Sequence, residues 1–300
     1  NKLALTDKVA TFFPESLPDT LSSYIRDMTV EDLLTMSTGM DTDPLFQAMG
    51  GVTDWPNVFL STPVQHAPGT IFKYNNMATF MLSAIVQKAT GETLFDFLKP
   101  RLFEPLGITQ ATWDERPAGV ALGAIGLRIP SNDMAKFGQL LLQKGNWNGK
   151  QLIPESWIEA ATSKHIDSND PGNTNPIESN DWAQGYGYQF WRSRYNSYRA
   201  DGLGGQFILV LPEKDAVVVL TASSRVTQDE LNVMWENLLP AMGDESLPED
   251  KASAVALKER IASLALSKTT SAVADPALVS KVSGKRMAIT QNDLGITAVR

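Results

Sequence analysis

The chain has 300 residues, 43% of them hydrophobic and 20% charged, a composition that can build an apolar core. Its formal net charge of −8 argues against nucleic acid or an anionic membrane surface as the main partner. It contains no cysteine and two histidines, His66 and His165, which lack the spacing of a zinc-binding pair. These counts exclude a thiol nucleophile, a disulfide framework and a thiolate metal site, and we expect neither a metal nor another cofactor. A hydrolase built on this chain must activate its nucleophile largely without imidazole.

The chain has no apolar run near the 18 residues that a transmembrane helix needs, so no transmembrane segment is expected. It begins at Asn1 without a methionine and ends at Arg300 within a strand-like alternation, so we expect both ends to have been cut from a longer protein. A signal peptide upstream is compatible with this, and a periplasmic or secreted location is slightly favoured over the cytoplasm. The sequence does not indicate an oligomeric state.

In chain order, the first half of the sequence predicts mainly helices. Residues 29–36 combine a capping residue, an acidic first turn and an apolar face, and Gly39 follows as a stop signal. Residues 41–70 are rich in Asp, Gly and Pro and predict a long loop with room for a short helix, a kind of segment that is usually functional or mobile. Further helices are predicted at residues 77–90, 93–103 and 131–145, and from residue 154 onward.

The pattern changes to strands after a polar surface loop at residues 165–184. Strands are predicted at residues 186–191, 207–211 and 216–221, the last two joined by a turn at 212–215. Residues 227–230 have the pattern of a capping box and open a helix that runs to Leu239. Helices inserted ahead of an antiparallel meander indicate an α+β fold with αβα layers.

The composition shifts at Gly243, where we place a domain boundary. Residues 1–243 are predicted to form the main domain, 244–267 a charged linker and an amphipathic helix, and 268–300 the start of an incomplete β-rich unit. The Asn-Asp pair at 292–293 marks the turn of a β-hairpin in that last segment.

The glycine-rich segment at residues 202–206 admits two interpretations. It lacks the dinucleotide-binding spacing and precedes a strand rather than a helix, so a nucleotide site is disfavoured. The simpler interpretation is a turn that needs positive φ at the entrance of a strand. The alternative is a close approach of the backbone to a ligand, with an exposed N–H donor. On glycine content alone, the turn is favoured.

Residues 68–76 lie directly before an apolar helix and are the second segment of interest. Asn75 or Asn76 fits as the cap of that helix, with Tyr74 packed across its start. Alternatively, a tyrosine hydroxyl and an amide at a helix N-terminus can transfer protons. Taken alone, the Tyr-x-Asn pattern is a weak signal.

Six segments together resemble the superfamily of class C β-lactamases and penicillin-binding proteins, which are serine hydrolases. They are residues 33–39, 68–76, 137–142, 145–154, 185–191 and 202–212, in the order of the family. The resemblance covers about residues 1–242 and implies a β-lactamase/transpeptidase-like fold, with an antiparallel sheet flanked by helices and an inserted helical region. The Gly-Leu-Gly-Gly-Gln form is similar to that of 6-aminohexanoate-dimer hydrolases and family VIII carboxylesterases.

The family acts through three motifs, and the resemblance assigns two of them to this chain. Tyr74 and Asn76 match the family's Tyr-x-Asn, and the Ala-Asp-Gly of residues 200–202 stands where the family has Lys/His-Thr/Ser-Gly. The Ser-x-x-Lys motif, which holds the nucleophile, would lie upstream of Asn1. This chain alone is therefore predicted to be catalytically inactive.

The resemblance implies an acyl-enzyme mechanism with defined roles. Tyr74 would be the acid/base, Asn76 would hold the lysine or the substrate amide, and the backbone N–H of Leu203 would donate to the oxyanion. Gly202 and Gly204 would leave room for the acyl group. Ionising a tyrosine at pH 7 costs roughly 4 kcal/mol from its ordinary pKa of about 10. A neighbouring cation is therefore required, unless Tyr74 relays a proton without ionising first.

The third motif departs from the family pattern. Ala200 lacks the cation with which lactamases and transpeptidases hold a substrate carboxylate, and Asp201 would repel that carboxylate. Arg199 is adjacent, but successive residues of a strand face opposite ways. We therefore expect a hydrolase of small-molecule esters or linear amides with uncharged acyl groups. The alternatives are a β-lactamase or D,D-peptidase acting on cell-wall-like substrates, and a non-catalytic peptide-binding or scaffold relative.

Several other side chains are candidates for the cleft or for the core. Trp191 alternates with Tyr186 and Tyr188, so it lies either in the core or on the substrate pocket, and Trp55 in the long loop is a candidate substrate-side aromatic. The two histidines are expected to be structural. Three loop carboxylates are expected to be solvated rather than to hold a metal: Asp41, Asp43 and Asp54.

Overall fold

The computed structural model describes residues 2–116, 119–169, 176–243, 245, 248–265, 275–288, 290 and 298–299. The chain divides into two compact units, Asn1–Asp244 and Glu245–Arg300, and each is described by itself. The hairpin turn predicted at 292–293 lies outside the described residues. Among the helices that the structure describes, none is long and apolar enough to cross a membrane.

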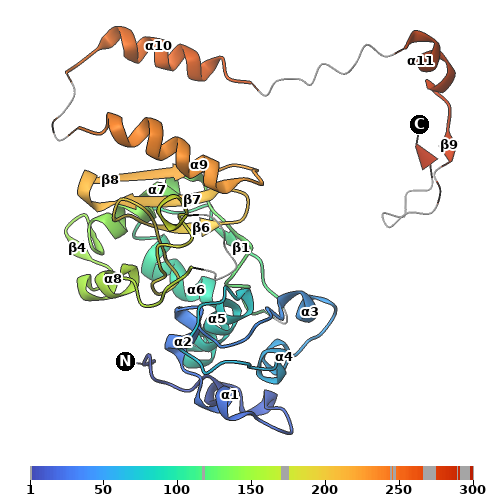
Figure 1. The fold of residues 1–300 in the computed structure, drawn as a ribbon, viewed down its shortest axis with the longest axis vertical. Helices are drawn as coiled ribbons and strands as arrows, with labels where there is room; N and C mark the ends of the chain where they lie inside the picture. The colour runs from blue at the N-terminus through green and yellow to red at the C-terminus, as the bar shows by residue number, and fades with distance from the viewer. Residues whose placement is uncertain are drawn as a thin grey trace. The chain divides into compact units, whose positions relative to one another are not determined.

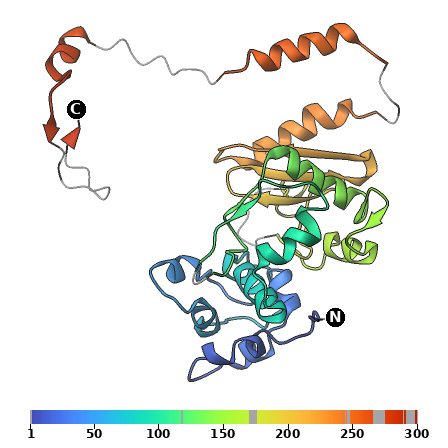
Figure 2. The same cartoon turned by 180° about the vertical axis from the view of Figure 1, so that it is seen from behind.

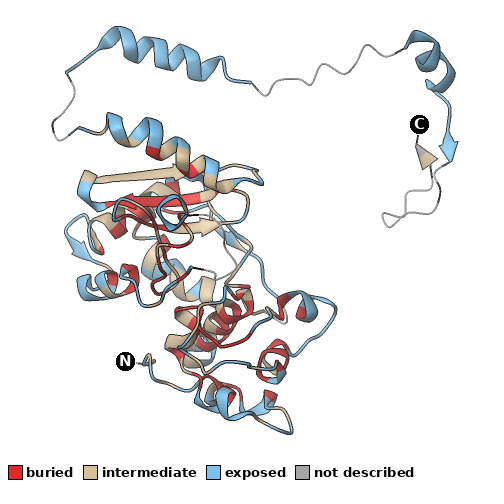
Figure 3. Ribbon diagram, in the orientation of Figure 1, coloured by how far each residue is buried: buried red, intermediate tan, exposed pale blue. Residues whose placement is uncertain are grey.

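The first part of the larger unit consists of short helices packed around one long helix, α5 (Asn76–Thr90) (Figure 1). The short elements are η1 (Val9–Phe12), η2 (Pro14–Ser16), α1 (Ser23–Asp27), α2 (Val30–Leu34), α3 (Leu45–Met49), α4 (Trp55–Ser61), α6 (Leu94–Leu98) and the π-helical turn η3 (Lys99–Phe103). Met77, Phe80 and Met81 of α5 are fully buried, with Leu33 and Phe59 in the same apolar cluster. Figure 3 shows buried residues along α5, because this helix is enclosed by its neighbours.

Local capping explains where two of these helices begin. At the start of α2, the Thr29 side chain accepts from the Asp32 N–H, which confirms the predicted capping residue. The Asp32 carboxylate accepts from the Thr29 N–H in return, so the cap is reciprocal. At the start of α5, the Asn75 side chain accepts from the Ala78 N–H, so Asn75 is the cap residue. Gly91 ends α5 at φ +78°, which is a conformation that glycine adopts without strain.

The second part of the larger unit is a four-stranded antiparallel sheet between helices (Figures 1 and 2). Its strands, in spatial order, are β5 (Trp191–Arg192), β6 (Tyr198–Gly202), β7 (Gln206–Leu211) and β8 (Ala216–Leu220). Helix α7 (Ser131–Leu142) packs on one face, where a Cβ on Gly138 would lie 2.8 Å from Ile208 Cγ2. Leu231 of α9 (Thr227–Val233) packs with Phe207 and Leu209 on the other face. The predicted α+β fold with αβα layers is confirmed.

The remaining elements of the larger unit are short connections and extensions. They are β1 (Thr112–Trp113), β2 (Leu127–Arg128), β3 (Asn146–Trp147), β4 (Lys150–Gln151), α8 (Glu155–Thr162), η4 (Ile177–Ser179), η5 (Pro212–Lys214), the π-helical η6 (Met234–Leu238) and η7 (Leu239–Ala241). β1 pairs with β2 and β3 with β4, both antiparallel. η5 forms the turn predicted between β7 and β8.

Among its described residues, the smaller unit contains two exposed helices and one strand pair. Helix α10 (Lys251–Ala262) begins after Asp250, whose side chain accepts from the Ser253 N–H, and all its residues are exposed. Helix α11 (Pro276–Val282) follows, and β9 (Met287–Ala288) pairs antiparallel with β10 (Ala298–Val299).

Two local predictions are wrong, each for a physical reason. The strand predicted at residues 186–191 is reduced to its end, because Gln189 lies at φ +64° and its side chain turns to bond with Thr79. Thr227 does not cap α9, because it is itself the first helical residue and Val226 precedes it without a side-chain cap. The helical course predicted up to Leu239 is nevertheless present through α9, η6 and η7.

Candidate active site

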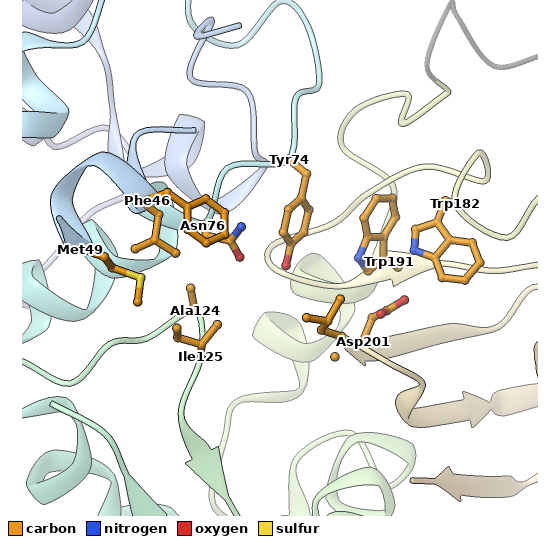
Figure 4. A pocket seen from close by; sticks show the side chains of 12 residues that line it. Phe46, Met49, Tyr74, Asn76, Ala124, Ile125, Trp182, Trp191 and Asp201 are labelled. Atoms are coloured by element: carbon orange, nitrogen blue, oxygen red, sulfur yellow. The ribbon is translucent and has the colours of Figure 1, made fainter. Parts of the chain in front are cut away.

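A cavity of about 580 Å³ lies where the helical part meets one end of the sheet (Figure 4). Helix α3, the start of α5, the segment before β2, and the strands β5 and β6 all contribute side chains to it. Its lining residues are Leu45, Phe46, Met49, Tyr74, Asn76, Ala124, Ile125, Trp182, Trp191, Asp201, Gly202 and Leu203. Among these described residues there is no lysine, arginine, histidine or serine, so the lining itself supplies neither a cation nor a serine nucleophile.

Tyr74 stands in the wall of this cavity, two residues before α5. Its ring stacks on Trp191, with centroids 5.7 Å apart and planes inclined by 12°, and meets Tyr186 edge-on. Tyr74 is 41% exposed, but desolvation of its hydroxyl group, together with the negative charges of Asp201 and Asp43, raises its pKa to about 12. Tyr74 is therefore neutral at pH 7 and can donate a proton, but its surroundings oppose the ionised form.

Asn76 is the first residue of α5 and is held by Asp43. The Asn76 N–H and the side-chain Nδ2 both donate to Asp43 Oδ2 at 2.8 Å, and the Met77 N–H donates to Asp43 Oδ1 at 3.2 Å. The prediction that Asp43 is a solvated loop charge is wrong, because its carboxylate satisfies N–H groups that the helix start leaves free. Asp54 is likewise a helix cap, accepting from the Asn57 N–H at 3.0 Å.

Asp201 is paired with Arg199 on the same face of β6. Arg199 Nε donates to Asp201 Oδ2 at 2.9 Å, and the fully buried guanidinium lies 4.5 Å from the ring of Trp182. Burial raises the pKa of Asp201, against the opposing effects of Arg199 and Trp182. Because Arg199 is enclosed and committed to Asp201, it does not replace the cation that Ala200 lacks.

The glycine-rich segment forms a tight turn between β6 and β7. The ladder ends at the pair Gly202–Gln206, and Gly204 and Gly205 have φ values of +82° and +90°. This confirms the interpretation as a turn that needs positive φ. The Leu203 side chain is fully exposed and lines the cavity together with Gly202, whereas Gly204 is not among the lining residues.

The structure separates the two tryptophans that the sequence offered as candidates. Trp191 lines the cavity beneath Tyr74. Trp55 begins α4 with 2% of its surface exposed and packs on Phe80 at 4.8 Å between ring centroids, which places it in the core. Neither histidine reaches the cavity: His66 lies beside Asp41. His165 stacks on Tyr188 at 4.0 Å.

Six lining residues were not anticipated from the sequence: Leu45, Phe46, Met49, Ala124, Ile125 and Trp182. Phe46 and Met49 sit three positions apart in a segment taken as a loop, and that helical spacing was the signal available for α3. Trp182 lies in a polar segment, and the Arg199 guanidinium lies 4.5 Å from its ring, a contact that the sequence does not indicate.

A sheet of this topology, layered between helices and facing a Tyr-x-Asn turn across a cavity, is the arrangement of the β-lactamase/transpeptidase fold. Residues 1–242 match the Beta-lactamase family, and the chain belongs to that family. The resemblance inferred from the six segments is thus confirmed.

Curated relatives share about a quarter of their residues with this chain over part of their length. A putative D-alanyl-D-alanine carboxypeptidase of Escherichia coli (strain K12) is 26% identical over 124 residues, 38% of this chain and 28% of the relative. A 6-aminohexanoate-dimer hydrolase of Paenarthrobacter ureafaciens is 25% identical over 159 residues, 51% of this chain and 39% of the relative. The aligned regions thus span well under half the length of these relatives.

Solved structures support the fold. A putative 6-aminohexanoate-dimer hydrolase from Bacillus anthracis superposes with a TM-score of 0.63 at 22% identity, over 80% of this chain and 66% of that one. An octameric penicillin-binding protein homologue from Pyrococcus abyssi gives a TM-score of 0.61 at 19% identity, over 81% and 61%. At these identities the likeness concerns the fold alone.

Proposed function

We propose that this chain supplies the acid/base, amide and oxyanion groups of a serine hydrolase that acts through an acyl-enzyme on uncharged esters or linear amides. One observation carries the proposal: Leu203 is far in the sequence from Tyr74 and Asn76, and all three residues line the same cavity. In this mechanism Tyr74 moves the proton, Asn76 positions the reacting groups and the Leu203 N–H stabilises the oxyanion.

Because its pKa is raised, Tyr74 needs a nearby cation before it can act as a base. Even at its ordinary pKa of about 10, ionising a tyrosine at pH 7 costs roughly 4 kcal/mol, and the raised pKa of Tyr74 increases that cost. A lysine ammonium about 4 Å away would stabilise the ionised tyrosine by about 4 kcal/mol at an effective dielectric constant near 20. Tyr74 therefore becomes an effective base only when a cation joins it.

The nucleophile is proposed to come from a segment that precedes Asn1 in a longer protein. None of the serines in the 300 residues is followed three positions later by lysine, and the described lining of the cavity contains no serine. A Ser-x-x-Lys segment placed beside Tyr74 would bring both the nucleophile and the missing ammonium. The chain from Asn1 to Arg300 is accordingly proposed to be inert alone.

The rim of the cavity supports an uncharged, apolar acyl group. Phe46 is 80% exposed and Leu203 is fully exposed, and Met49 and Ile125 present further apolar surface around the same cavity. A substrate carboxylate would meet the charge of Asp201 and no lining cation. This favours an esterase or linear amidase over a β-lactamase.

The test compares the longer protein with the chain alone. A fluorophosphonate probe should label the longer protein and leave Asn1–Arg300 unlabelled, because the probe reacts with an activated serine. The labelled protein should hydrolyse p-nitrophenyl butyrate far faster than nitrocefin. An unlabelled longer protein would instead support a non-catalytic binding relative, and preferred cleavage of nitrocefin would support a β-lactamase.

A Tyr74→Phe variant of the longer protein tests the proton-transfer role. It should keep its fold and lose about 100-fold or more in kcat, since general acid–base groups typically contribute that much. Full activity in this variant would remove Tyr74 from the mechanism.

A further inference from the structure

A second cavity, of about 270 Å³, borders the same helix, α3, as the first. Its described lining residues are Ala48, Met49, Gly51, Val52, Trp55, Glu115 and Arg116. Among the residues that the structure describes, Met49 alone lines both cavities. Tyr74, Asn76 and Leu203 do not border the second cavity, so its walls do not depend on the segment that is proposed to join Tyr74.

The register of α3 places Met49 at the boundary between the two cavities. Phe46 and Met49 lie about one helical turn apart and line the first cavity. Ala48 and Val52 are spaced in the same way and line the second cavity, and the Val52 N–H donates to the Ala48 carbonyl at 3.3 Å. Met49 lies on the edge that these two faces share. Figure 4 shows its side chain next to Phe46, across the first cavity from Asp201.

The walls of the second cavity are held by hydrogen bonds within the chain. Trp55 Nε1 donates to the Val52 carbonyl at 3.0 Å, and 2% of the Trp55 surface is exposed. In the segment that supplies the charged residues, the Arg116 N–H donates to the Val120 carbonyl at 2.8 Å. Glu115 and Arg116 carry opposite charges, so the described lining has no formal net charge. Its other members are Ala, Met, Gly, Val and Trp residues, which suit an uncharged alkyl chain.

We propose that Met49 is a specificity-determining residue, which sets the length of the linear acyl chain that the first cavity accepts by closing it off from the second. The second cavity is then a subsite for the end of a longer chain, and it becomes accessible when Met49 is shortened. The inference rests on the proposed function, in that it takes the first cavity as the place where the acyl chain of the substrate lies.

The apolar rim of the first cavity leads to Met49. Phe46 is 80% exposed and lies one turn before Met49, so an alkyl chain that packs on Phe46 meets the Met49 side chain next. Each methylene that leaves water for apolar surroundings should tighten binding by up to about fourfold. Methylenes beyond Met49 stay in water and add little, because its side chain lies between the two cavities. Affinity should therefore rise with chain length and then level off.

The Met49→Ala variant should remove this boundary. The substitution deletes the side-chain atoms beyond Cβ, and the space that they leave should join the two cavities. A longer chain can then bury its end against Val52 and Trp55. Met49 is 48% exposed, so we expect the variant to fold.

The test uses four linear methyl ketones: 2-hexanone, 2-octanone, 2-decanone and 2-dodecanone. They carry the carbonyl group of an ester but cannot be hydrolysed. Their binding to the chain is measured by the fluorescence of Trp182 and Trp191, which line the first cavity. For the unaltered chain, affinity should rise along the series and level off before 2-dodecanone. Met49→Ala should bind 2-dodecanone roughly tenfold or more tightly than the unaltered chain does, as two further buried methylenes allow.

Two control variants separate the boundary from the general apolar character of the rim. Met49→Leu keeps a side chain of similar volume, so affinity should level off at the same chain length as in the unaltered chain. Phe46 lines the first cavity and not the second. Phe46→Ala should therefore weaken the binding of all four ketones without moving the chain length at which affinity levels off.

Any of three results would overturn the inference. The first is an affinity that rises through 2-dodecanone in the unaltered chain, a result that needs no variant to fold. The second is an unchanged chain-length profile in a Met49→Ala protein that circular dichroism shows to be folded. The third is the absence of saturable binding for all four ketones. None of these measurements involves catalysis, so a failure of fluorophosphonate labelling would reject the proposed function without deciding whether Met49 separates the cavities.

Discussion

The buried pair of Arg199 and Asp201 offers the sharpest test of how the sheet end of the cavity is held. In Arg199→Met the apolar part of the side chain can still pack against Trp182, but Asp201, 14% exposed, loses its cation. Breaking a buried ion pair by removing one partner typically costs 3–5 kcal/mol. Arg199 Nη2 is buried without a hydrogen-bond partner among the residues that the structure describes, so its removal also removes the cost of burying that unpaired N–H group. We therefore expect a loss of about 3 kcal/mol in the free energy of unfolding.

The assay is urea unfolding at pH 7, followed by circular dichroism, for the chain, for Arg199→Met and for the double variant with Asp201→Asn. The double variant should recover about half of the loss, because the unpaired charge is gone while the donors to Ser193 and to the Asp181 carbonyl stay absent. Without Arg199 the pKa of Asp201 should rise further above its ordinary value. The loss in Arg199→Met should then shrink between pH 7 and pH 5, as Asp201 takes up a proton.

A cost below about 1 kcal/mol in Arg199→Met would refute the reasoning, because it would show that Asp201 does not depend on its partner. A double variant no more stable than Arg199→Met would refute it equally, since the loss would then lie in packing and not in charge.

Three further predictions concern stability. Burial raises the pKa of Asp181, but hydrogen bonds from Arg194, Gln228 and Trp235 outweigh it and hold that pKa below its ordinary value. The ionised carboxylate therefore stabilises the fold, and this contribution should be lost as the pH falls below about 4. In Asp181→Asn the melting temperature, followed by circular dichroism, should depend less on pH in this acid range. Gly205→Ala should cost about 2 kcal/mol or more in urea unfolding, because φ is +90° and the new Cβ would overlap a neighbouring carboxylate; a cost under 0.5 kcal/mol would contradict this. Asp43→Ala should lower the free energy of unfolding by about 1–2 kcal/mol through the helix start that it caps, and an unchanged urea midpoint would contradict that role.

The features that the sequence predicted well are those decided within a few residues. The capping residue at Thr29, the end of α5 at Gly91 and the turn between β7 and β8 each depend on neighbours along the chain. The same holds for positive φ at the glycines after Leu203. Tyr74 and Asn76 were singled out by resemblance to a family, because the pattern alone fits a helix cap equally well.

The features that the sequence did not predict depend on contacts between distant segments. Asp43 and Asn76 are 33 positions apart, and nothing near Asp43 in the sequence distinguishes it from the solvated carboxylate it was taken to be. Trp182 comes from a polar segment, and its ring contacts the Arg199 guanidinium of β6, which is 17 positions further along the chain. Trp55 was predicted to line the cavity, but it lies at the start of α4 and packs against Phe80 in the core.

The middle residue of Tyr-x-Asn has a consequence of its own. Asn75 is 1% exposed, and its side-chain oxygen caps α5. Its backbone N–H donates to the sulfur of Met36, and its side-chain Nδ2 donates to the sulfur of Met40. Tyr74 and Asn76 line the cavity, whereas Asn75 between them is buried in the core. A position that the family motif leaves free is therefore constrained in this chain to a short side chain that both donates and accepts, and a larger or apolar residue there would displace the two groups on either side of it together.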